Sequence, residues 1–471
     1  MTDPPSRMVR IGNGAGFWGD SARGPLQLVR GGGIDYLTMD FLAEVTMSIL
    51  QKMRARDPES GYATDFVSQL EQILPEASAR GIRVIANAGG VNPGACARAV
   101  TEVVDRLGLD VTVATVTGDD VLPRLAELLD AGHDLCHLST GEPLAPQADR
   151  VRSANAYLGA FPIAEALGRG ADVVITGRVA DASLTVAPLI HEFGWGSRDY
   201  DKLAAATVAG HIIECGPQCT GGNLDRWREV PDLDAIGYPI VEVEGDGSFV
   251  VTKKADTGGL VDLDSVTAQL LYEIGDPRRY LTPDVIADFT SIVLTPDGPD
   301  RVRVTGVRGE PPTDTLKVSV SIHQGWKVTG LLTVGGPDAP DKARATARIL
   351  FARLKQAGVT FPEEDCLVEL LGTNTLYPGM LGGQESEPSE VVLRICVRAA
   401  ERTGLDRFGA EIASLVTSGP PGLTGFSGGR PRASEVIGFW PALLARDVVP
   451  SVVTVGAPTG PANPRTAGVP A

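Results

Sequence analysis

A run of helix, apolar strand, polar turn and second helix constrains the fold more than any other part of the chain. It occupies residues 159–196, GAFPIAEALGRGADVVITGRVADASLTVAPLIHEFGWG. Residues 171–176 are almost wholly apolar, which is typical of a parallel strand buried on both faces. The polar residues Gly177, Arg178 and Asp181 follow this strand directly. Because ligands of open α/β sheets bind at the carboxyl ends of the strands, this turn is a predicted binding site.

The rest of the first half alternates strands with helices. Apolar runs predict strands at residues 9–12, 34–40, 82–87, 111–116 and 173–176. Apolar residues at helical spacing predict helices between them, at residues 64–80 and 120–131 among others. This alternation predicts the α/β class, with an N-terminal, mostly parallel sheet that carries helices on both faces.

The pattern changes after about Pro231. Short strands separated by Gly, Asp and Pro turns are predicted at residues 240–243, 249–253, 301–307 and 316–322, and helices at 265–274, 341–356 and 390–403. We therefore expect an α/β domain with Gly-rich loops over residues 1–230 and a second, α+β domain over residues 231–456. Residues 457–471 are expected to form a disordered tail.

Charge and hydropathy argue against several classes of partner. The chain has 42 Lys and Arg against 59 Asp and Glu, a net charge of −17, whereas nucleic acids and anionic membranes bind clustered cations. The N-terminus has no apolar signal core, and no run approaches the roughly 18 apolar residues of a membrane span. We therefore expect a cytoplasmic protein that binds neither nucleic acid nor membrane. The six cysteines are too sparse for a disulfide framework and are expected to be reduced thiols.

A Gly-rich loop follows the first predicted strand. It contains the string G-x-G-x-x-G from Gly14 to Gly19, with Gly16 at its second glycine. In a dinucleotide site such glycines let the backbone approach a pyrophosphate at a helix N-terminus. Residues 21–25 do not predict a helix, however, and Asp40 is only a loose candidate for a ribose partner. Two interpretations remain open, a nicotinamide or flavin site and a Gly-rich loop that lines a different active site.

A second polar loop, NAGGVNPG, follows the predicted strand at residues 82–87. Asn87, Gly89 and Gly90 offer amide groups to a carbonyl or a phosphate. The alternative is a plain strand-to-helix turn in which Pro93 opens the helix.

The turn after the strand at residues 171–176 combines a cation with a carboxylate. Arg178 suits a carboxylate or phosphate of a ligand, and Asp181 is either a general base or the group that holds Arg178 in place. A purely structural Arg–Asp pair is the alternative.

The densest group of reactive side chains lies near the end of the first domain. His211 and Glu214 are three residues apart on a predicted helix, so they share a face and are suited to shuttle protons. Cys215 beside them is either a nucleophile or a small buried hydrophobe. The remaining candidates in this region are His191 for catalysis and Gly221, Gly222 and Asn223 for substrate binding.

No metal site or cofactor is predicted. His133 and His137 stand four residues apart with Cys136 between them, but no third ligand follows at a recognised metal-binding spacing.

Five segments of the chain together resemble the acyclic terpene utilisation AtuA family. They are GNGAGFWGD, NAGGVNPG, PIAEALGRGADVVITGRVADASLTVAPLIHEFGW, AGHIIECGPQCTGGN and YPIVEVEGDGSFVVTKKADTGGLVDLDSVTAQLLYEIGDPRRYLTPDVIADF, and the resemblance covers residues 8–455. It implies a role in the breakdown of acyclic terpenes through acyl-CoA thioesters. Many similar proteins carry a C-terminal ferredoxin-like domain that this sequence lacks, so a separate small ferredoxin-like subunit is one expected partner.

These observations lead to one hypothesis for the function. Gly-rich loops and a fixed Arg around one cleft suit an acyl-CoA thioester or a related carboxylate. The expected chemistry is acid–base catalysis of the hydratase or lyase type, without a cofactor. Glu214 or Asp181 is assigned as acid or base and Arg178 as the anion anchor. The amides near Gly89, Gly90 and Gly221 are assigned as oxyanion or phosphate donors.

Two alternatives come from other functional classes. In the first alternative, the chain is a non-catalytic or partner-dependent subunit of a heteromeric complex. In the second it is an NAD(P)-dependent oxidoreductase that uses the loop at Gly14. In each case we expect the chain to form a homo-oligomer.

Overall fold

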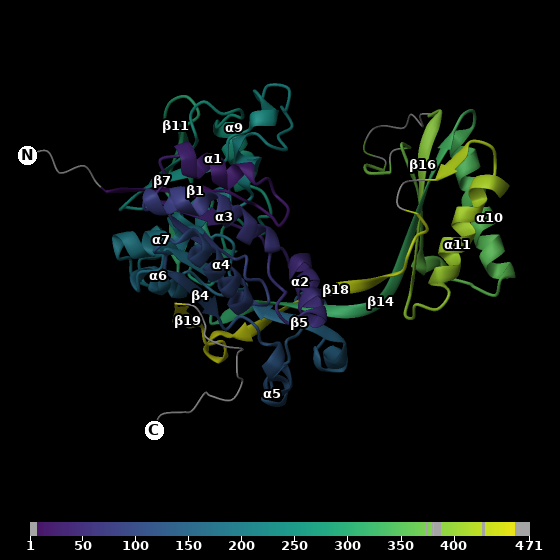
Figure 1. The fold of residues 1–471 in the computed structure, drawn as a ribbon, viewed down its shortest axis with the longest axis horizontal. Helices are drawn as coiled ribbons and strands as arrows, with labels where there is room; N and C mark the ends of the chain where they lie inside the picture. Colours follow the sequence, from purple (N-terminus) through teal and green to yellow (C-terminus); the bar gives the residue numbers. More distant parts are fainter. Residues whose placement is uncertain (1–6, 374, 379, 381–387, 426–428, 457–471) are drawn as a thin grey trace, which may run out of the picture. The chain divides into compact units, whose positions relative to one another are not determined.

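The computed structural model describes residues 7–373, 375–378, 380, 388–425 and 429–456. The chain divides into two compact units: unit 1 runs from the N-terminus to residue 321 and resumes at residue 439, and unit 2 is residues 322–438. The chain enters unit 2 along β14 (Thr315–Gly335) and leaves it along β18 (Ser434–Ala445), which pairs with β14 (Figure 1). The tail predicted at residues 457–471 lies outside the described residues.

The centre of unit 1 is a parallel sheet of five strands. In spatial order these are β1 (Met8–Asn13), β2 (Tyr36–Met39), β3 (Arg83–Ala86), β6 (Val173–Thr176) and β4 (Val113–Thr117). Every neighbouring pair in this row is parallel. All five strands coincide with strands that the apolar runs predict, since strands buried on both faces have near-continuous apolar sequences. The predicted α/β class is confirmed.

Helices cover both faces of this sheet. One layer is α1 (Arg23–Gly31), α3 (Thr64–Ala79) and α4 (Pro93–Leu107), which share a buried apolar cluster with Leu37 and Met39 of β2. The other layer is α6 (Phe161–Gly168), α7 (Ser183–Phe193) and α8 (Tyr200–Ile213), which pack on one another. Tyr36 donates a hydrogen bond to Glu192 of α7, and successive residues of a strand point to opposite faces. The two layers therefore lie on opposite sides of the sheet.

The start of α1 corrects one expectation. Residues 21–25 do not predict a helix, yet α1 begins at Arg23, only a few residues after the Gly-rich loop. Pro25 stands in its first turn, where a missing backbone N–H is not needed for helical hydrogen bonding.

Antiparallel strands extend the sheet at both edges. β7 (Pro239–Glu244), β8 (Phe249–Lys253), β12 (Val302–Thr305) and β11 (Val293–Pro296) follow β1 on one side, and β19 (Val452–Val455) pairs with β4 on the other. β7 pairs with β1 from Met8–Glu244 to Gly12–Ile240. The domain boundary expected at residue 230 thus falls inside unit 1, because the strands after it belong to the same sheet.

The remaining elements of unit 1 lie outside this ten-stranded sheet. They are α2 (Glu44–Arg56), α5 (Leu125–Asp130), β5 (Val151–Ala156), α9 (Leu263–Leu270) and a small sheet of β9 (Tyr280–Leu281), β10 (Ile286–Asp288) and β13 (Arg308–Glu310). The helix predicted at residues 120–131 is a 3-10 turn, Leu122–Arg124, followed by α5. Short 3-10 turns also occur at Ala145–Arg150, Gly216–Thr220, Leu233–Ala235 and Arg446–Val448.

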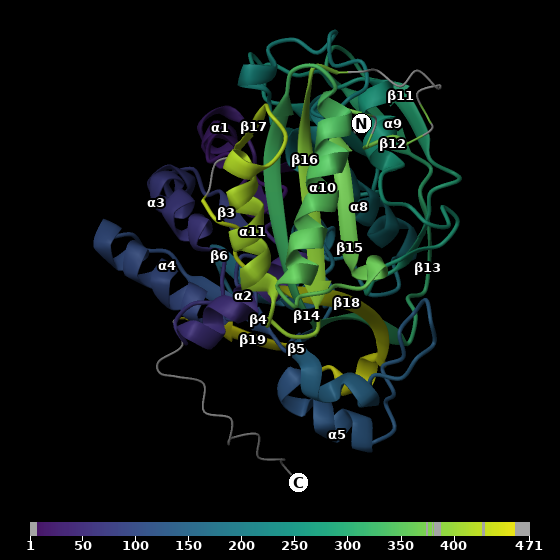
Figure 2. The ribbon, with the colours of Figure 1, turned by 90° about the vertical axis from the view of Figure 1, so that its right-hand side faces the viewer.

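Unit 2 is an antiparallel sheet with two helices on one face. Its strands run in the order β15 (Cys366–Leu371), β16 (Glu390–Ala399), β14 and β17 (Leu423–Gly425), and a 3-10 turn, Glu363–Asp365, precedes β15. α10 (Ala339–Gln356) and α11 (Leu405–Ser418) lie side by side over this sheet (Figure 2). Leu350 of α10, Phe408 of α11 and Leu393 of β16 belong to the same buried core.

The helix predicted at residues 390–403 is wrong, because this segment forms strand β16. Val391, Leu393, Ile395 and Val397 are buried while the residues between them are not, a period of two. The helix of this region is α11, which the sequence analysis does not predict. Among the described residues, no helix combines the length and the apolar character needed to cross a membrane.

Candidate functional site

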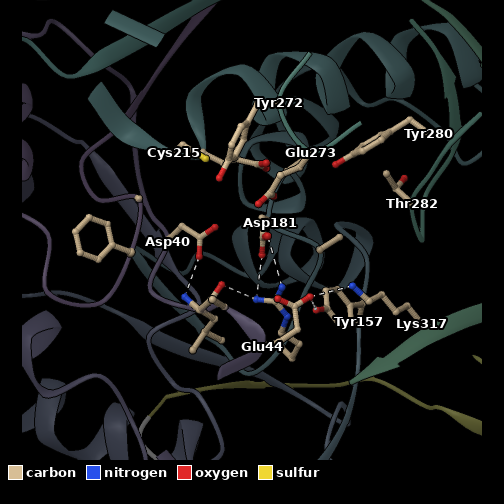
Figure 3. Close-up of a pocket in the computed structure, with 18 of the residues that line it drawn as sticks. Asp40, Glu44, Tyr157, Asp181, Cys215, Tyr272, Glu273, Tyr280, Thr282 and Lys317 are labelled. Atoms are coloured by element: carbon tan, nitrogen blue, oxygen red, sulfur yellow. Dashed lines mark hydrogen bonds and ion pairs between the residues drawn. The ribbon is translucent and has the colours of Figure 1, made fainter. Parts of the chain in front are cut away.

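A cavity of about 870 Å³ lies at the carboxyl ends of the central strands of unit 1. The loop after β1 contributes Gly16 and Phe17, the loop after β2 contributes Asp40, and the loop after β6 contributes Arg178 and Asp181. Figure 3 shows Cys215, Tyr272 and Glu273 on one side of the cavity, and Glu44, Tyr157 and Lys317 on the other. The position agrees with the predicted edge of the sheet.

Arg178 forms the fixed cationic centre of the cavity wall. Its side chain is only 2% exposed, its Nη1 donates to the carbonyl of Leu42 at 2.9 Å, and the same nitrogen lies 3.0 Å from Asp181 Oδ1. The guanidinium also lies 4.2 Å from the ring centroid of Tyr157, a cation–π contact. A guanidinium with these three contacts supplies positive charge at a fixed point. It has little freedom to bind a ligand carboxylate or phosphate directly, which is the role predicted for it from the sequence.

The backbone of Arg178 is also fixed. Its N–H donates to Oδ2 of Asp119, a buried carboxyl that follows β4, at 2.8 Å. Asn155 of β5 donates to the same oxygen at 2.8 Å. Burial raises the pKa of Asp119 to about 7, against the lowering effect of these hydrogen bonds. Asp119 therefore positions the turn that carries Arg178 and Asp181.

Asp40 lines the cavity at the end of β2 and is held by its own hydrogen bonds. Its Oδ1 accepts from the backbone N–H of Leu42 at 3.0 Å and from Nδ2 of Asn87 at 2.6 Å. Asn87 in turn accepts from the N–H of Phe41 at 2.7 Å. Burial raises the pKa of Asp40 to about 6, although the charge of Arg178 lowers it. Asn87 does not line the cavity, so its side chain positions Asp40 rather than a ligand.

Asp181 is the most strongly perturbed carboxyl of the site. Burial raises its pKa well above the ordinary range, the charge of Arg178 lowers it, and the carboxylates of Asp40 and Glu214 raise it further. These effects favour the protonated form of Asp181. A neutral carboxyl that faces a cavity is suited to donate a proton.

His211 and Glu214 form a pair at the end of α8. His211 Nδ1 lies 3.2 Å from Glu214 Oε1, as their spacing on one helical face predicts. Glu214 lines the cavity, whereas His211 is 1% exposed and lies behind it, beside the rings of Tyr280 and Phe289. Burial lowers the pKa of His211, but the hydrogen bond and charge of Glu214, together with backbone hydrogen bonds, outweigh burial and raise it. His211 is thus placed to fix the orientation of Glu214.

Cys215 lines the cavity next to this pair. Burial raises the pKa of its thiol to about 12, and the carboxylate of Glu214 raises it further. Only the thiolate is a strong nucleophile, so this environment favours a thiol that serves as wall rather than as reactant. A Cβ on Gly16 would lie 2.7 Å from the carbonyl carbon of Cys215, which explains why glycine stands at that position.

A second charged group on the cavity wall is absent from the sequence-based predictions. Glu44, at the start of α2, accepts from Tyr157 Oη at 2.8 Å and from Lys317 Nζ at 2.9 Å. Although burial alone raises the pKa of Glu44, the charge and hydrogen bond of Lys317 outweigh it and lower the pKa to about 2. Glu44 stands five residues after the end of β2, and this position is a signal in the sequence for a residue of the site. Lys317 comes from β14, far along the chain, and has no such signal.

Several predicted binding glycines lie outside the cavity. Of the predicted binding residues in the Gly-rich loops other than Asn87, three line the cavity and four do not. Those that line it are Gly16, Gly222 and Asn223, and those that do not are Gly14, Gly89, Gly90 and Gly221. A Cβ on Gly89 would lie 2.6 Å from the carbonyl oxygen of Thr176, so this glycine lets two strand ends approach. The loop that contains it leads into α4, with Asn92 as N-cap and Pro93 in the first turn. The structure thus favours the plain strand-to-helix turn there.

His191 lies at the opposite edge of the sheet. Its Nε2 is 3.0 Å from Nη1 of Arg83, the first residue of β3, whereas the cavity lies at the strands' carboxyl ends. His191 is therefore not part of the cavity. His191 stands near the end of α7, whereas Asp181 precedes the start of this helix.

The candidate metal ligands give no site. His133, Cys136 and His137 lie outside helices and strands, so they do not share a helical face. Within the part of the chain that the structure describes, no group of three or more His, Cys, Asp or Glu side chains is placed to hold a metal ion.

The Gly14 loop already holds a carboxylate. Asp20 accepts from the N–H of Gly16 at 2.9 Å, from the N–H of Ser21 and from Tyr238 Oη. A pyrophosphate needs these free amides and would meet the negative charge of Asp20. This geometry argues against the dinucleotide interpretation and favours a Gly-rich loop that lines another kind of site.

Comparison with known proteins supports the resemblance found in the sequence. The family model described as acyclic terpene utilisation family protein AtuA matches residues 9–455. No curated protein matches the chain. A homoserine dehydrogenase from Thiobacillus denitrificans aligns with 88% of this chain and 84% of its own, at 11% identity, but the TM-score of 0.15 is too low to indicate a shared fold. Because the family match spans nearly the whole sequence, the chain belongs to the acyclic terpene utilisation AtuA family.

Proposed function

We propose that this chain is an enzyme of acyclic terpene or branched acyl breakdown that performs acid–base chemistry of the hydratase or lyase type on an acyl-CoA thioester. One observation carries the proposal. Asp181, whose pKa is raised by burial, and Glu214, which is backed by His211, line the same cavity, with the fixed charge of Arg178 beside them. Two carboxyl groups whose environments differ in this way are suited to opposite roles in one reaction.

The roles follow from the contacts of each side chain. Glu214, oriented by His211, takes a proton from a water molecule whose oxygen forms a bond to the β-carbon of an enoyl thioester. The π electrons move towards the thioester carbonyl, and Asp181 delivers a proton to the α-carbon. Water is thereby added across the double bond, and solvent returns the two carboxyl groups to their starting states. The reverse sequence removes water.

The lining of the cavity supports an apolar acyl group. Phe17, Leu42, Leu281, Leu316 and Leu443 all line it, together with the polar groups described above. A cleft that is largely apolar with a few convergent polar groups is typical of a small-molecule site.

Substitution of Glu214 by Gln tests the role of the base. We expect turnover of a branched enoyl-CoA to fall by about 10²–10⁴-fold, with a much smaller change in KM, because the amide keeps the shape and loses the basicity. Glu102→Gln, on the exposed side of α4, is the matched control. Unchanged turnover in Glu214→Gln would remove Glu214 from the mechanism, and thioesters that neither bind nor react would refute the substrate class.

The same assay separates the alternative functions. Turnover that requires a separate small ferredoxin-like subunit would support the partner-dependent interpretation, and light scattering of the active protein would test the expected homo-oligomer. Binding of NADH but not of thioesters, measured by thermal denaturation, would favour the oxidoreductase.

A further inference from the structure

We infer that the cavity selects a ligand with an apolar chain and an uncharged polar end, and that Asp40 and Glu273 repel the corresponding free carboxylate. This inference rests on the proposed function and deepens it, since it states which form of the acyl group the site accepts. It comes from two features of the lining, an excess of carboxyl groups and an exposed apolar rim.

The excess of carboxyl groups is large. Six side chains with carboxyl groups line the cavity, against two cations, Arg178 and Lys317. Both cations are already paired, Arg178 with Asp181 at 3.0 Å and Lys317 with Glu44 at 2.9 Å. The guanidinium of Arg178 is moreover only 2% exposed, and the ammonium of Lys317 is held by Glu44, so a ligand anion has limited access to either cation.

The carboxyl groups outside these pairs do not all face the ligand equally. Asp20 is engaged by the amides of its own loop and by Tyr238, and Glu214 by His211. The hydrogen bonds that Asp40 accepts from Leu42 and Asn87 both go to Oδ1, so Oδ2 takes part in neither, and Glu273 is an exposed side chain of the same cavity lining. Figure 3 shows Asp40 and Glu273 among the side chains that line the cavity.

The apolar rim consists of large side chains that are unusually exposed. Phe17, Leu138, Tyr272, Leu281 and Leu443 line the cavity and are 40–59% exposed. They come from five separate segments of unit 1, so their gathering around one opening is a property of the fold. Exposed apolar side chains gathered at one cavity mark a binding site, and here they suit a hydrocarbon chain.

The consequence for selectivity is electrostatic. Two unit charges a few ångströms apart at a partly buried site interact by more than 1 kcal/mol. An ionised acid in this cavity meets the charges of Asp40 and Glu273, whereas a thioester or an amide of the same chain does not. We therefore expect at least about a tenfold preference for the uncharged form.

Calorimetric titration with a matched pair of ligands tests this selection. The pair is a branched medium-chain enoic acid and its primary amide, which has the same shape without the charge and does not react as a thioester. At neutral pH the amide is expected to bind at least about tenfold more tightly than the acid, a difference of about 1.4 kcal/mol.

Two variants assign the effect to named groups. Asp40→Asn keeps an acceptor oxygen for Leu42 and Asn87, and Glu273→Gln changes an exposed side chain that folding does not require. Each variant is expected to reduce the preference for the amide over the acid severalfold, mainly because it binds the acid more tightly. Asp105→Asn, on the exposed side of α4, is the control and should leave the ratio unchanged.

The outcomes separate this inference from the proposed function. Equal affinities for acid and amide in the unmodified protein, or an unchanged ratio in both variants, would refute the selection even if thioesters are turned over. Selective binding of the amide without any thioester turnover would support the selection and refute the proposed chemistry. Failure of both ligands to bind would overturn the two together.

Discussion

Substitution of Asp119 by Asn makes a quantitative prediction about stability. Burial raises the pKa of this carboxyl from 3.8 to about 7, so the folded protein holds the proton more tightly than the unfolded chain. A group of this kind stabilises the fold fully below its unfolded pKa, and that contribution is lost as the pH rises through its folded pKa. Each tenfold change in proton affinity corresponds to 1.36 kcal/mol, so the whole contribution is about 4 kcal/mol.

About half of this change lies between pH 5.5 and pH 8. Over this interval the unfolded carboxyl is already ionised and the folded one loses its proton, which removes about 2 kcal/mol of stability. Asn keeps one oxygen for the N–H of Arg178 and for Asn155 and has no proton to lose. The free energy of unfolding of Asp119→Asn minus that of the unmodified protein should therefore be about 2 kcal/mol larger at pH 8 than at pH 5.5.

Urea denaturation followed by tryptophan fluorescence measures this difference. Four of the five tryptophans, Trp18, Trp195, Trp227 and Trp440, lie in unit 1, so the signal reports mainly on the unit that contains Asp119. Comparison with the unmodified protein at each pH cancels the contributions of the other carboxyl groups, and exposed Asp105→Asn serves as control. A difference that stays constant between the two pH values would show that Asp119 is ionised in the fold and would refute the reasoning.

Three further predictions test the walls of the cavity. Gly16→Ala places a methyl group against the backbone of Cys215 and should cost about 1–3 kcal/mol and weaken ligand binding. Gly94→Ala, on α4, places a methyl group only at van der Waals distance from Arg98 Nη1, 3.7 Å, and should be neutral or stabilising in thermal denaturation. Cys215→Ser should retain turnover, and alkylation of Cys215 at pH 8 should be slow because its thiol has a pKa of about 12; rapid alkylation would contradict this environment. A double-mutant cycle of Glu44→Gln and Lys317→Met should give a coupling free energy of only about 0.5–1 kcal/mol, since both side chains are more than a third exposed.

The part of the cavity that lies at the ends of the central strands can be predicted from the sequence. Apolar strands are followed directly by Asp40, Asn87 and Arg178, and parallel strands bring their carboxyl ends to one edge. The pairing of His211 with Glu214 follows equally from helical spacing. In these cases the interaction depends on a local pattern or on a rule of sheet topology, and both are visible in a single sequence.

The walls of the cavity were not predictable in the same way. Lys317 reaches Glu44 across 273 positions of sequence, and Leu443 arrives after the chain has passed through unit 2. No local pattern records such contacts, because only tertiary packing creates them. The error at residues 390–403 has a different origin, since the apolar alternation that marks β16 is present in the sequence and predicts a strand, not a helix.

The excess of carboxyl groups in the cavity also restricts the chemistry that the site can support. A reaction that placed lasting negative charge on a substrate oxygen would oppose Asp40 and Glu214 while Arg178 is largely occupied by Asp181. Such a cavity favours steps in which the substrate atom that gains electrons is protonated at the same time. A buried carboxyl that keeps its proton is the group that supplies this proton. Burial is the main cause of the raised pKa of Asp181, and the crowding of carboxyl groups that raises this pKa further also repels a free carboxylate.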